Sequence, residues 1–292
     1  MSMDVRHPTT HREIDSWCKG LRLPKRTGRL RFAQREVLCA IAASDIGRSI
    51  VFKGGNALRI MHGNPRGTLD LDFTAVESVP DQEAWFSDHV GAAVSGVPQV
   101  RGIKMRAQSI KRLPPKPGAH LPTYSVRIGF CIAGDRGYDL KYVENGRDMN
   151  EIVELEISLN DLVCEWASYR IDEAQNGSIA TCTIDDILGE KLRSLLQQLI
   201  RNRTRPQDVY DIAKQWRDRR DSLNLGHIRE YTLRKCEIRQ IEPRRSSFDD
   251  EVRLRAEEGY GHLREHTGAD YIEFDVAWGL VLELIGEIGL PD

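Results

Sequence analysis

Polar and apolar residues alternate along three segments in the middle of the chain, at residues 100–110, 124–132 and 152–159. Alternation with a period of two is typical of β-strands that bury one face. Two earlier segments, residues 31–46 and 81–93, instead carry apolar side chains at helical spacing. This pattern predicts a mixed or antiparallel sheet decorated by helices.

From residue 183 onward the strand pattern fades and helical spacing dominates. The clearest helix is expected at residues 184–200, with Thr183 as its N-cap and two aspartates, Asp185 and Asp186, in its first turn. Further helices are expected at residues 206–219, 225–239, 247–258 and 272–288.

The polar segment DEAQNGS, which contains Gly177, separates these two patterns. We therefore expect an α+β protein with two domains. Residues 1–177 would form an α/β domain with a mixed sheet, and residues 178–292 would form a mostly helical C-terminal domain.

Charge is balanced over the whole chain, with 42 lysines and arginines, 44 aspartates and glutamates, and a formal net charge of −2. No overall basic excess therefore indicates a nucleic-acid partner. Basic residues do cluster locally, at residues 19–31, 104–116 and 201–220. Each run fits either a contact with a phosphate backbone or a solvated charged face.

The six cysteines lie far apart, with no C-x-x-C pair, which indicates reduced structural thiols rather than a metal centre. No apolar run approaches the ~20 residues of a membrane-spanning helix, and the polar N-terminus has no apolar signal core. We therefore expect a cytoplasmic protein with no membrane contact.

Candidate chemistry begins at residues 52–73, which read FKGGNALRIMHGNPRGTLDLDF. A short strand at residues 49–52 precedes Gly54 and Gly55, which let the backbone turn tightly at the start of a helix. A helix N-terminus with close backbone approach suits a phosphate group.

Asp70 and Asp72 alternate with Leu69, Leu71 and Phe73, so both carboxylates project from one side of a strand. Such a pair repels by roughly 1 kcal/mol or more unless a cation lies between its members. The carboxylates fit a site for hard divalent cations. A solvated edge strand is the alternative.

A later strand, VELEISL, repeats the arrangement, with Glu154 and Glu156 on one face. Three carboxylates commonly hold two cations in phosphoryl transfer. Either glutamate fits as a third ligand, and the EIS context favours Glu156. An ordinary amphipathic strand is the alternative.

In their order along the chain, five motifs resemble those of the AbiEii/AbiGii toxin group and its MenT relatives, within the nucleotidyltransferase superfamily. The motifs are KGGNAL from Lys53, RGTLDLD from Arg66, ELEIS from Glu154, EKLRSL from Glu190 and RPQDVYD from Arg205. The resemblance spans roughly residues 45–215 and implies a nucleotidyltransferase-type fold for the first domain.

The resemblance also implies roles for individual residues. Asp70 and Asp72 would bind the metals, with Glu156 as the third carboxylate. The remaining residues would bind the nucleotide, namely Gly54, Gly55, Asn56, Arg66, Thr68, Lys191 and Asp208. Lys191 and Asp211 are expected to take part in catalysis with the metal aspartates, and Asp211 would orient the attacking group.

Some of these positions have simpler interpretations. Lys191 could pair with Asp185 or Asp186 as a surface lysine. Asp208 could merely stabilise the first turn after Pro206. The family often has a basic residue where this chain has Gln207, and Arg205 is the expected source of that charge instead.

The function implied by the resemblance is a toxin that transfers a nucleoside monophosphate from an NTP to an RNA acceptor, with Mg²⁺ or Mn²⁺ and release of pyrophosphate. The expected acceptor is the 3′ end of tRNA, and modification of that end would inhibit translation. The toxin would act within a toxin-antitoxin or phage-defence module, together with a cognate antitoxin. The alternatives are a protein AMPylase, a small-molecule nucleotidyltransferase and a non-catalytic NTP-binding regulator.

Overall fold

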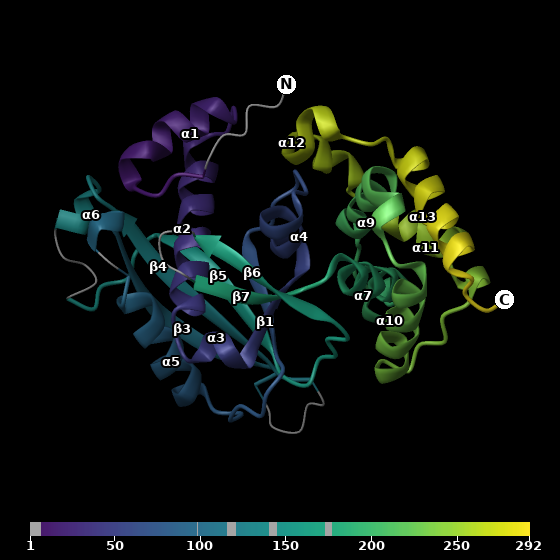
Figure 1. Ribbon diagram of the computed structural model, residues 1–292, viewed down its shortest axis with the longest axis horizontal. Coiled ribbons are helices and arrows are strands. Elements are labelled where there is room, and N and C mark those ends of the chain that lie inside the picture. Colours follow the sequence, from purple (N-terminus) through teal and green to yellow (C-terminus); the bar gives the residue numbers. More distant parts are fainter. Residues whose placement is uncertain (1–6, 98, 116–120, 140–144, 173–176) are drawn as a thin grey trace. The chain divides into compact units, whose positions relative to one another are not determined.

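A computed structural model describes residues 7–97, 99–115, 121–139, 145–172 and 177–292 (Figure 1). The chain forms two compact units. The first, here called the sheet unit, comprises Met1–Phe52, Leu69–Asp161 and Ser168–Ala180. The second, here called the helical unit, comprises Lys53–Thr68, Leu162–Ala167 and Thr181–Asp292.

Seven strands form one sheet in the described part of the chain, in the order β3-β4-β5-β2-β1-β7-β6. Their bounds are β1 Ile50–Lys53, β2 Asp70–Ala75, β3 Ile103–Leu113, β4 Thr123–Ile132, β5 Glu151–Ser158, β6 Trp166–Asp172 and β7 Gly177–Cys182. Strand β2 pairs with β5 in parallel, whereas β4 is antiparallel to both β3 and β5. The sheet is therefore mixed.

The helices of the sheet unit are α1 Ile14–Gly20, α2 Lys25–Ala42, α3 Ile46–Ser49, α5 Glu83–Ser95 and α6 Arg136–Asp139. Helix α2 packs against β5 and α5, and α5 packs against β3. The apolar side chains of the alternating strands form the other side of this core, and Leu71, Phe73 and Leu155 are fully buried there.

The helical unit contains α4 Gly54–His62, α7 Ile184–Leu196, α8 Gln198–Arg201, α9 Pro206–Arg219, α10 Leu225–Ile238, α11 Asp250–Glu257, α12 Arg264–Thr267 and α13 Phe274–Ile288. Helix α7 packs against α4, α9 and α10, and α13 packs against α9. Apolar side chains such as Leu192, Ile212 and Val281 are fully buried there.

Local signals explain where two of these helices begin. The Thr183 side chain accepts a hydrogen bond from the Asp186 backbone nitrogen at 3.3 Å, which confirms the expected N-cap of α7. Helix α9 begins at Pro206, a residue that suits the first helical position because its missing N–H would have no partner there.

The expected fold class is confirmed by the mixed sheet and the helical C-terminal region. Two expected helices differ clearly in extent. The helix predicted at 31–46 begins earlier, at Lys25, and ends at Ala42, where the Ser44 hydroxyl bonds the Ile41 carbonyl oxygen at 2.7 Å. The helix predicted at 184–200 ends at Leu196 and is followed by the separate short helix α8.

No helix within the described residues combines the length and apolar character that crossing a membrane requires. All six cysteines are free thiols, and five of them are buried.

Candidate active site

The two metal-binding aspartates predicted from the sequence lie on β2 in the sheet unit. Asp70 is the first residue of that strand, and both Asp70 and Asp72 are half-buried. Their neighbours Leu71 and Phe73 are fully buried on the opposite face. The strand therefore exposes one carboxylate face and buries one apolar face, as its alternation predicts.

Strand β5 adds two glutamates to this carboxylate face. In the parallel register Asp70 lies opposite Glu154, and Asp72 lies opposite Glu156. Directly paired residues point to the same side of a sheet. Their oxygen atoms suit hard divalent cations such as Mg²⁺ or Mn²⁺, so the residues present fit a metal site.

The two glutamates differ in their surroundings. Glu154 is exposed and lies opposite Arg127 of β4, with 3.8 Å between the Arg127 Nε and a carboxylate oxygen of Glu154. Glu156 is half-buried and lies between Asp72 on one side and Ser125 on the other. Glu156 therefore has the more enclosed carboxylate.

Glycine is required at the two positions that begin α4 for different structural reasons. Gly54 has a φ of 76°, in the left-handed region that glycine adopts without strain. At Gly55 an added Cβ would lie 2.6 Å from the Thr68 Cγ2 and 2.8 Å from a terminal nitrogen of Arg66. Gly55 thus allows the segment from Arg66 to Thr68 to pack directly on the helix.

Asn56 is fully buried and reinforces the same packing. Its side-chain nitrogen donates to the Thr68 carbonyl oxygen at 3.0 Å, and its side-chain oxygen accepts from the Arg59 Nε at 2.9 Å. Gly54, Gly55, Asn56 and Thr68 are therefore brought together, and the Asn56 amide positions Thr68.

A cluster of four charged side chains, here called the ion cluster, lies in the helical unit and consists of Arg66, Lys191, Asp208 and Asp211. The Lys191 Nζ lies 2.6 Å from an oxygen of Asp208 and 2.8 Å from an oxygen of Asp211. The Arg66 guanidinium donates twice to the Asp211 carboxylate, once from Nε at 2.9 Å. All four side chains are buried, and the cluster balances two cations against two anions.

Pairing in the ion cluster keeps Asp211 and Lys191 charged despite burial. Burial alone raises the pKa of Asp211, but Arg66 and Lys191 outweigh it and lower the pKa to about 2. Burial lowers the pKa of Lys191, yet Asp208 and Asp211 raise it overall. Asp211 is consequently an ionised hydrogen-bond acceptor with no surface of its own.

Sequence reasoning missed one member of this network, Asn64. It is buried, and its side-chain nitrogen donates to an oxygen of Asp211 at 2.7 Å. Asn64 follows Gly63, which ends α4 with a φ of 71°. Its position in the turn before the Arg66 motif was the available signal, but asparagine is common in turns for local reasons.

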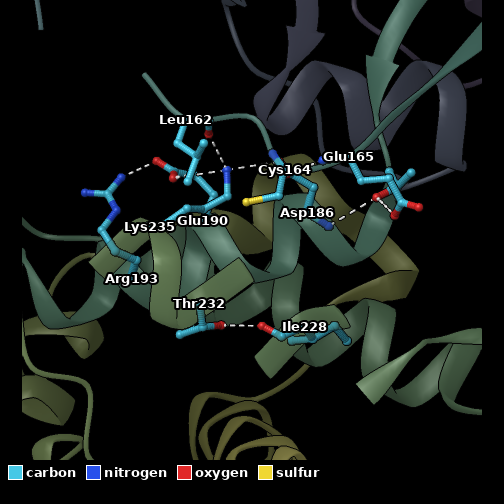
Figure 2. Close-up of polar contacts among 10 residues, drawn as sticks. Leu162, Cys164, Glu165, Asp186, Glu190, Arg193, Ile228, Thr232 and Lys235 are labelled. Carbon is cyan, nitrogen blue, oxygen red and sulfur yellow. Dashed lines mark hydrogen bonds and ion pairs between the residues drawn. The ribbon is translucent and has the colours of Figure 1, made fainter. Parts of the chain in front are cut away.

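The opposite face of α7 carries a second buried network, drawn in Figure 2. Lys235 of α10 is 4% exposed, and its Nζ donates to an Asp186 oxygen at 3.0 Å and to the Leu162 carbonyl oxygen at 2.7 Å. The other Asp186 oxygen accepts from the Cys164 backbone nitrogen at 2.7 Å. Asp186 therefore pairs with Lys235, and Lys191 pairs with Asp208 and Asp211 on the ion-cluster face.

Another group of potential metal ligands within the described residues comprises Glu165, Asp185 and His227. Its carboxylates already accept hydrogen bonds from a hydroxyl group and a backbone N–H group. Glu165 accepts from the Thr183 hydroxyl at 2.9 Å, and Asp185 accepts from the Asn224 backbone nitrogen at 3.3 Å. We interpret this group as capping interactions at the starts of α7 and α10.

A cavity of about 340 Å³ lies in the sheet unit, lined by residues of α2, α3 and α5 such as Cys39 and His89. None of the predicted site residues lines it.

The sequence of residues 36–278 matches the family described as nucleotidyl transferase AbiEii toxin, type IV toxin-antitoxin system. The chain belongs to this family, which confirms the resemblance inferred from the five motifs. No curated protein gives a significant match.

Several solved structures are similar to the chain. One is a nucleotidyltransferase from H. pylori, with a TM-score of 0.48 and 15% identity, covering 91% of this chain and 96% of that one. JHP933 from Helicobacter pylori has a TM-score of 0.45 and 15% identity, covering 87% of this chain and 88% of that one. MenT4, a nucleotidyltransferase toxin from Mycobacterium tuberculosis H37Rv, has a TM-score of 0.46 and 14% identity, covering 90% of this chain and 92% of that one.

Proposed function

We propose that the chain is a metal-dependent toxin that transfers a nucleoside monophosphate from an NTP to the 3′ end of an RNA, with tRNA as the acceptor. Modification of that end would inhibit translation and growth until a cognate antitoxin intervenes, in a toxin-antitoxin or phage-defence module. The observation that carries the proposal is the register of β2 and β5, which pairs Asp72 with Glu156 beside Asp70.

Asp70, Asp72 and Glu156 would hold Mg²⁺ or Mn²⁺. When bound, the metal supplies positive charge to the triphosphate and its leaving pyrophosphate. Glu154 is the less suitable third ligand because Arg127 already lies beside it.

The nucleotide would be held by residues of the helical unit. The backbone N–H groups of Gly54 and Gly55 open α4 and suit phosphate oxygens. The Thr68 hydroxyl lies two residues before Asp70 in the chain, and Asn56 orients the Thr68 backbone.

Lys191 would contribute a point charge to the phosphates. Its ammonium has three donors, of which Asp208 and Asp211 occupy two, and in this proposal the third would bind a phosphate oxygen. In place of the direct roles that the resemblance implies for them, we propose Asp208 and Asp211 as positioning residues, because they hold Lys191 and Arg66 in buried ion pairs.

In the proposed reaction the 3′-hydroxyl oxygen of the RNA attacks the α-phosphorus of the NTP. A new P–O bond forms, the bond between the α-phosphorus and the bridging oxygen breaks, and pyrophosphate leaves. The hydroxyl proton passes to solvent.

The test is incubation of the protein with each of four α-labelled NTPs and with purified tRNAs, total protein and small-molecule acceptors. Label should appear in tRNA, and Asp70→Ala and Lys191→Ala should abolish it, whereas the control Asp88→Ala on exposed helix surface should not. Label in protein or in a small molecule, but not in RNA, would contradict the RNA acceptor. No label in any fraction would favour a non-catalytic NTP-binding regulator.

A further inference from the structure

Three arginines lie close together in the sequence between α7 and the body of α9, namely Arg201, Arg203 and Arg205. Arg201 ends α8, and the other two precede Pro206. Residues 192–207 contain four arginines and no acidic residue. The segment is therefore locally basic although the whole chain is almost neutral.

Buried hydrogen bonds hold the backbone of this segment in place. The Gln198 side chain is 1% exposed, and its nitrogen donates to the Leu195 carbonyl oxygen at 3.0 Å. Its oxygen accepts from the Arg205 backbone nitrogen at 2.8 Å. The Arg203 backbone nitrogen also donates to the Gln198 carbonyl oxygen, at 3.0 Å. The backbone that carries the three arginines is thus held in a fixed turn.

Like charges surround Arg201. Burial lowers the pKa of its guanidinium, and Arg239, Arg193, Arg203 and Arg205 lower it further. Arg201 and Arg203 are exposed, and no carboxylate among the described residues forms an ion pair with Arg201, Arg203 or Arg205. Arg201, Arg203 and Arg205 therefore concentrate positive charge that no acidic side chain of the described residues neutralises.

Several other basic positions in the runs singled out from the sequence form ion pairs with carboxylates. Arg217 pairs with Asp218, Arg220 pairs with Glu283 and Glu287, and Arg112 pairs with Asp81. The arginines at 201–205 therefore differ from these paired arginines, because no carboxylate of the described residues forms an ion pair with them.

We propose that Arg201, Arg203 and Arg205 form an anchoring surface for the phosphate backbone of the acceptor RNA. This inference rests on the proposed function, because an RNA acceptor must be held while its 3′ end reacts. Guanidinium groups match phosphate oxygens with paired donors and stack on bases. Ile200 is 69% exposed beside Arg201 and offers apolar contact to a base.

The test measures binding of the full chain to unfractionated tRNA carrying a 5′ fluorophore, by anisotropy, in the absence of NTP and at several KCl concentrations. The variant is Arg201→Gln with Arg203→Gln, two exposed residues outside the ion cluster. The matched control is Arg217→Gln with Arg234→Gln, which removes the same charge from paired arginines of the helical unit.

The variant should bind about tenfold more weakly at 50 mM KCl, and its slope of log affinity against log salt should fall by about 1 for each arginine removed. The control should stay within about twofold of the wild type. NTP binding and the unfolding midpoint should be unchanged in both.

An unchanged salt slope and affinity in the variant would overturn the proposal, as would a wild-type chain that does not bind tRNA. Loss of binding to poly-L-glutamate with intact tRNA binding would also overturn it, in favour of an acidic protein segment. The assay contains no NTP, so a failure of nucleotide transfer, measured separately, would count against the proposed function and not against this surface.

Discussion

Asp211 is fully buried, yet its carboxylate is ionised because three side chains donate to it or pair with it. Arg66 donates from two nitrogens, Asn64 donates from its amide, and the Lys191 ammonium lies at 2.8 Å. A buried charge is tolerated when pairing and hydrogen bonds offset the loss of hydration. The ion cluster is consequently sensitive to any single change of charge.

Replacing Asp211 by Asn should destabilise the protein by about 3–5 kcal/mol, because Arg66 and Lys191 would then share only Asp208 as a buried counter-charge. Urea unfolding followed by circular dichroism measures the effect. Asp218→Asn on the same helix is the control, since its carboxylate is 40% exposed and pairs with Lys214 and Arg217. It should cost about 1 kcal/mol or less, and equal losses in both variants would contradict the account.

The same carboxylate predicts a pH dependence. Its pKa is lowered from 3.8 in the unfolded chain to about 2 in the folded one, so its stabilisation is complete above pH 4 and is lost as the pH falls toward 2. The stability difference between wild type and Asp211→Asn should therefore shrink by about 2 kcal/mol over that window. A difference that stays constant from pH 5 to pH 2 would show that this carboxyl has an ordinary pKa.

Gly55 is predicted to be intolerant of a methyl group. Gly55→Ala should displace Thr68 or Arg66, since its Cβ would lie within 2.8 Å of both side chains, and so weaken NTP binding and lower the unfolding midpoint. Gly279→Ala on α13, where a Cβ meets no atom within 4 Å, should leave NTP binding unchanged and add about 0.5–1 kcal/mol of stability. Calorimetric NTP binding and thermal unfolding measure both variants, and normal NTP affinity in Gly55→Ala would be inconsistent with this packing.

At the scale of the element, α7 connects two buried networks. One face carries Lys191 toward Asp208 and Asp211, and the other carries Asp186 toward Lys235 (Figure 2). Lys235 also holds the Leu162 carbonyl oxygen, so the segment Leu162–Ala167 is tied to α7 and α10. The orientation of α7 about its axis therefore depends on the ion pairs of both faces, and the position of Lys191 depends on that orientation.

Lys235→Met should loosen the segment around Cys164, whose backbone nitrogen bonds Asp186. Cys164 is half-buried and its pKa is raised to about 11, mainly by burial, so its thiol should react slowly in the wild type. Alkylation followed by mass spectrometry should show a faster reaction at Cys164 in the variant. Arg234→Met, at the exposed neighbouring position, is the control, and equal rates in both variants would argue against the restraint.

Strong periodicity predicted most elements. Helix α9 matches its expected bounds of 206–219, and β4 and β5 each differ from theirs by about one residue. Strands β6 and β7 were missed, because short segments such as GSIATC mix glycine, polar and apolar residues without alternation. Their place at one side of the sheet depends on pairing with β1, which no local pattern encodes.

For the site, alternation was sufficient to place Asp70 and Asp72 on one face of β2, because side-chain direction in a strand follows from spacing alone. The pairing of Asp72 with Glu156 required the strand register, since the two residues are far apart in sequence. Likewise, neither the pairing of Arg66 with Asp211 nor the Cβ clash at Gly55 follows from local pattern. Both depend on tertiary packing.

Over the whole molecule, the proposed metal ligands belong to the sheet unit and the proposed nucleotide-binding side chains belong to the helical unit. The chain passes between the units around Lys53 and Thr68, at both ends of the segment that carries the glycine turn. Net charge is close to zero, so the acidic strand face and the arginine segment at 201–205 are local arrangements. Their chemistry fits the proposed transfer between two polyanionic substrates, an NTP and an RNA.

Single-turnover transfer of labelled nucleotide to tRNA at saturating NTP measures whether the β2 carboxylates make this chain a nucleotidyltransferase. Asp72→Asn should lower the transfer rate by about 100-fold or more, because a bound metal contributes several kcal/mol to such a reaction. Asp88→Asn, at an exposed position of α5, should react at the wild-type rate. Equal rates for wild type and Asp72→Asn would contradict the account.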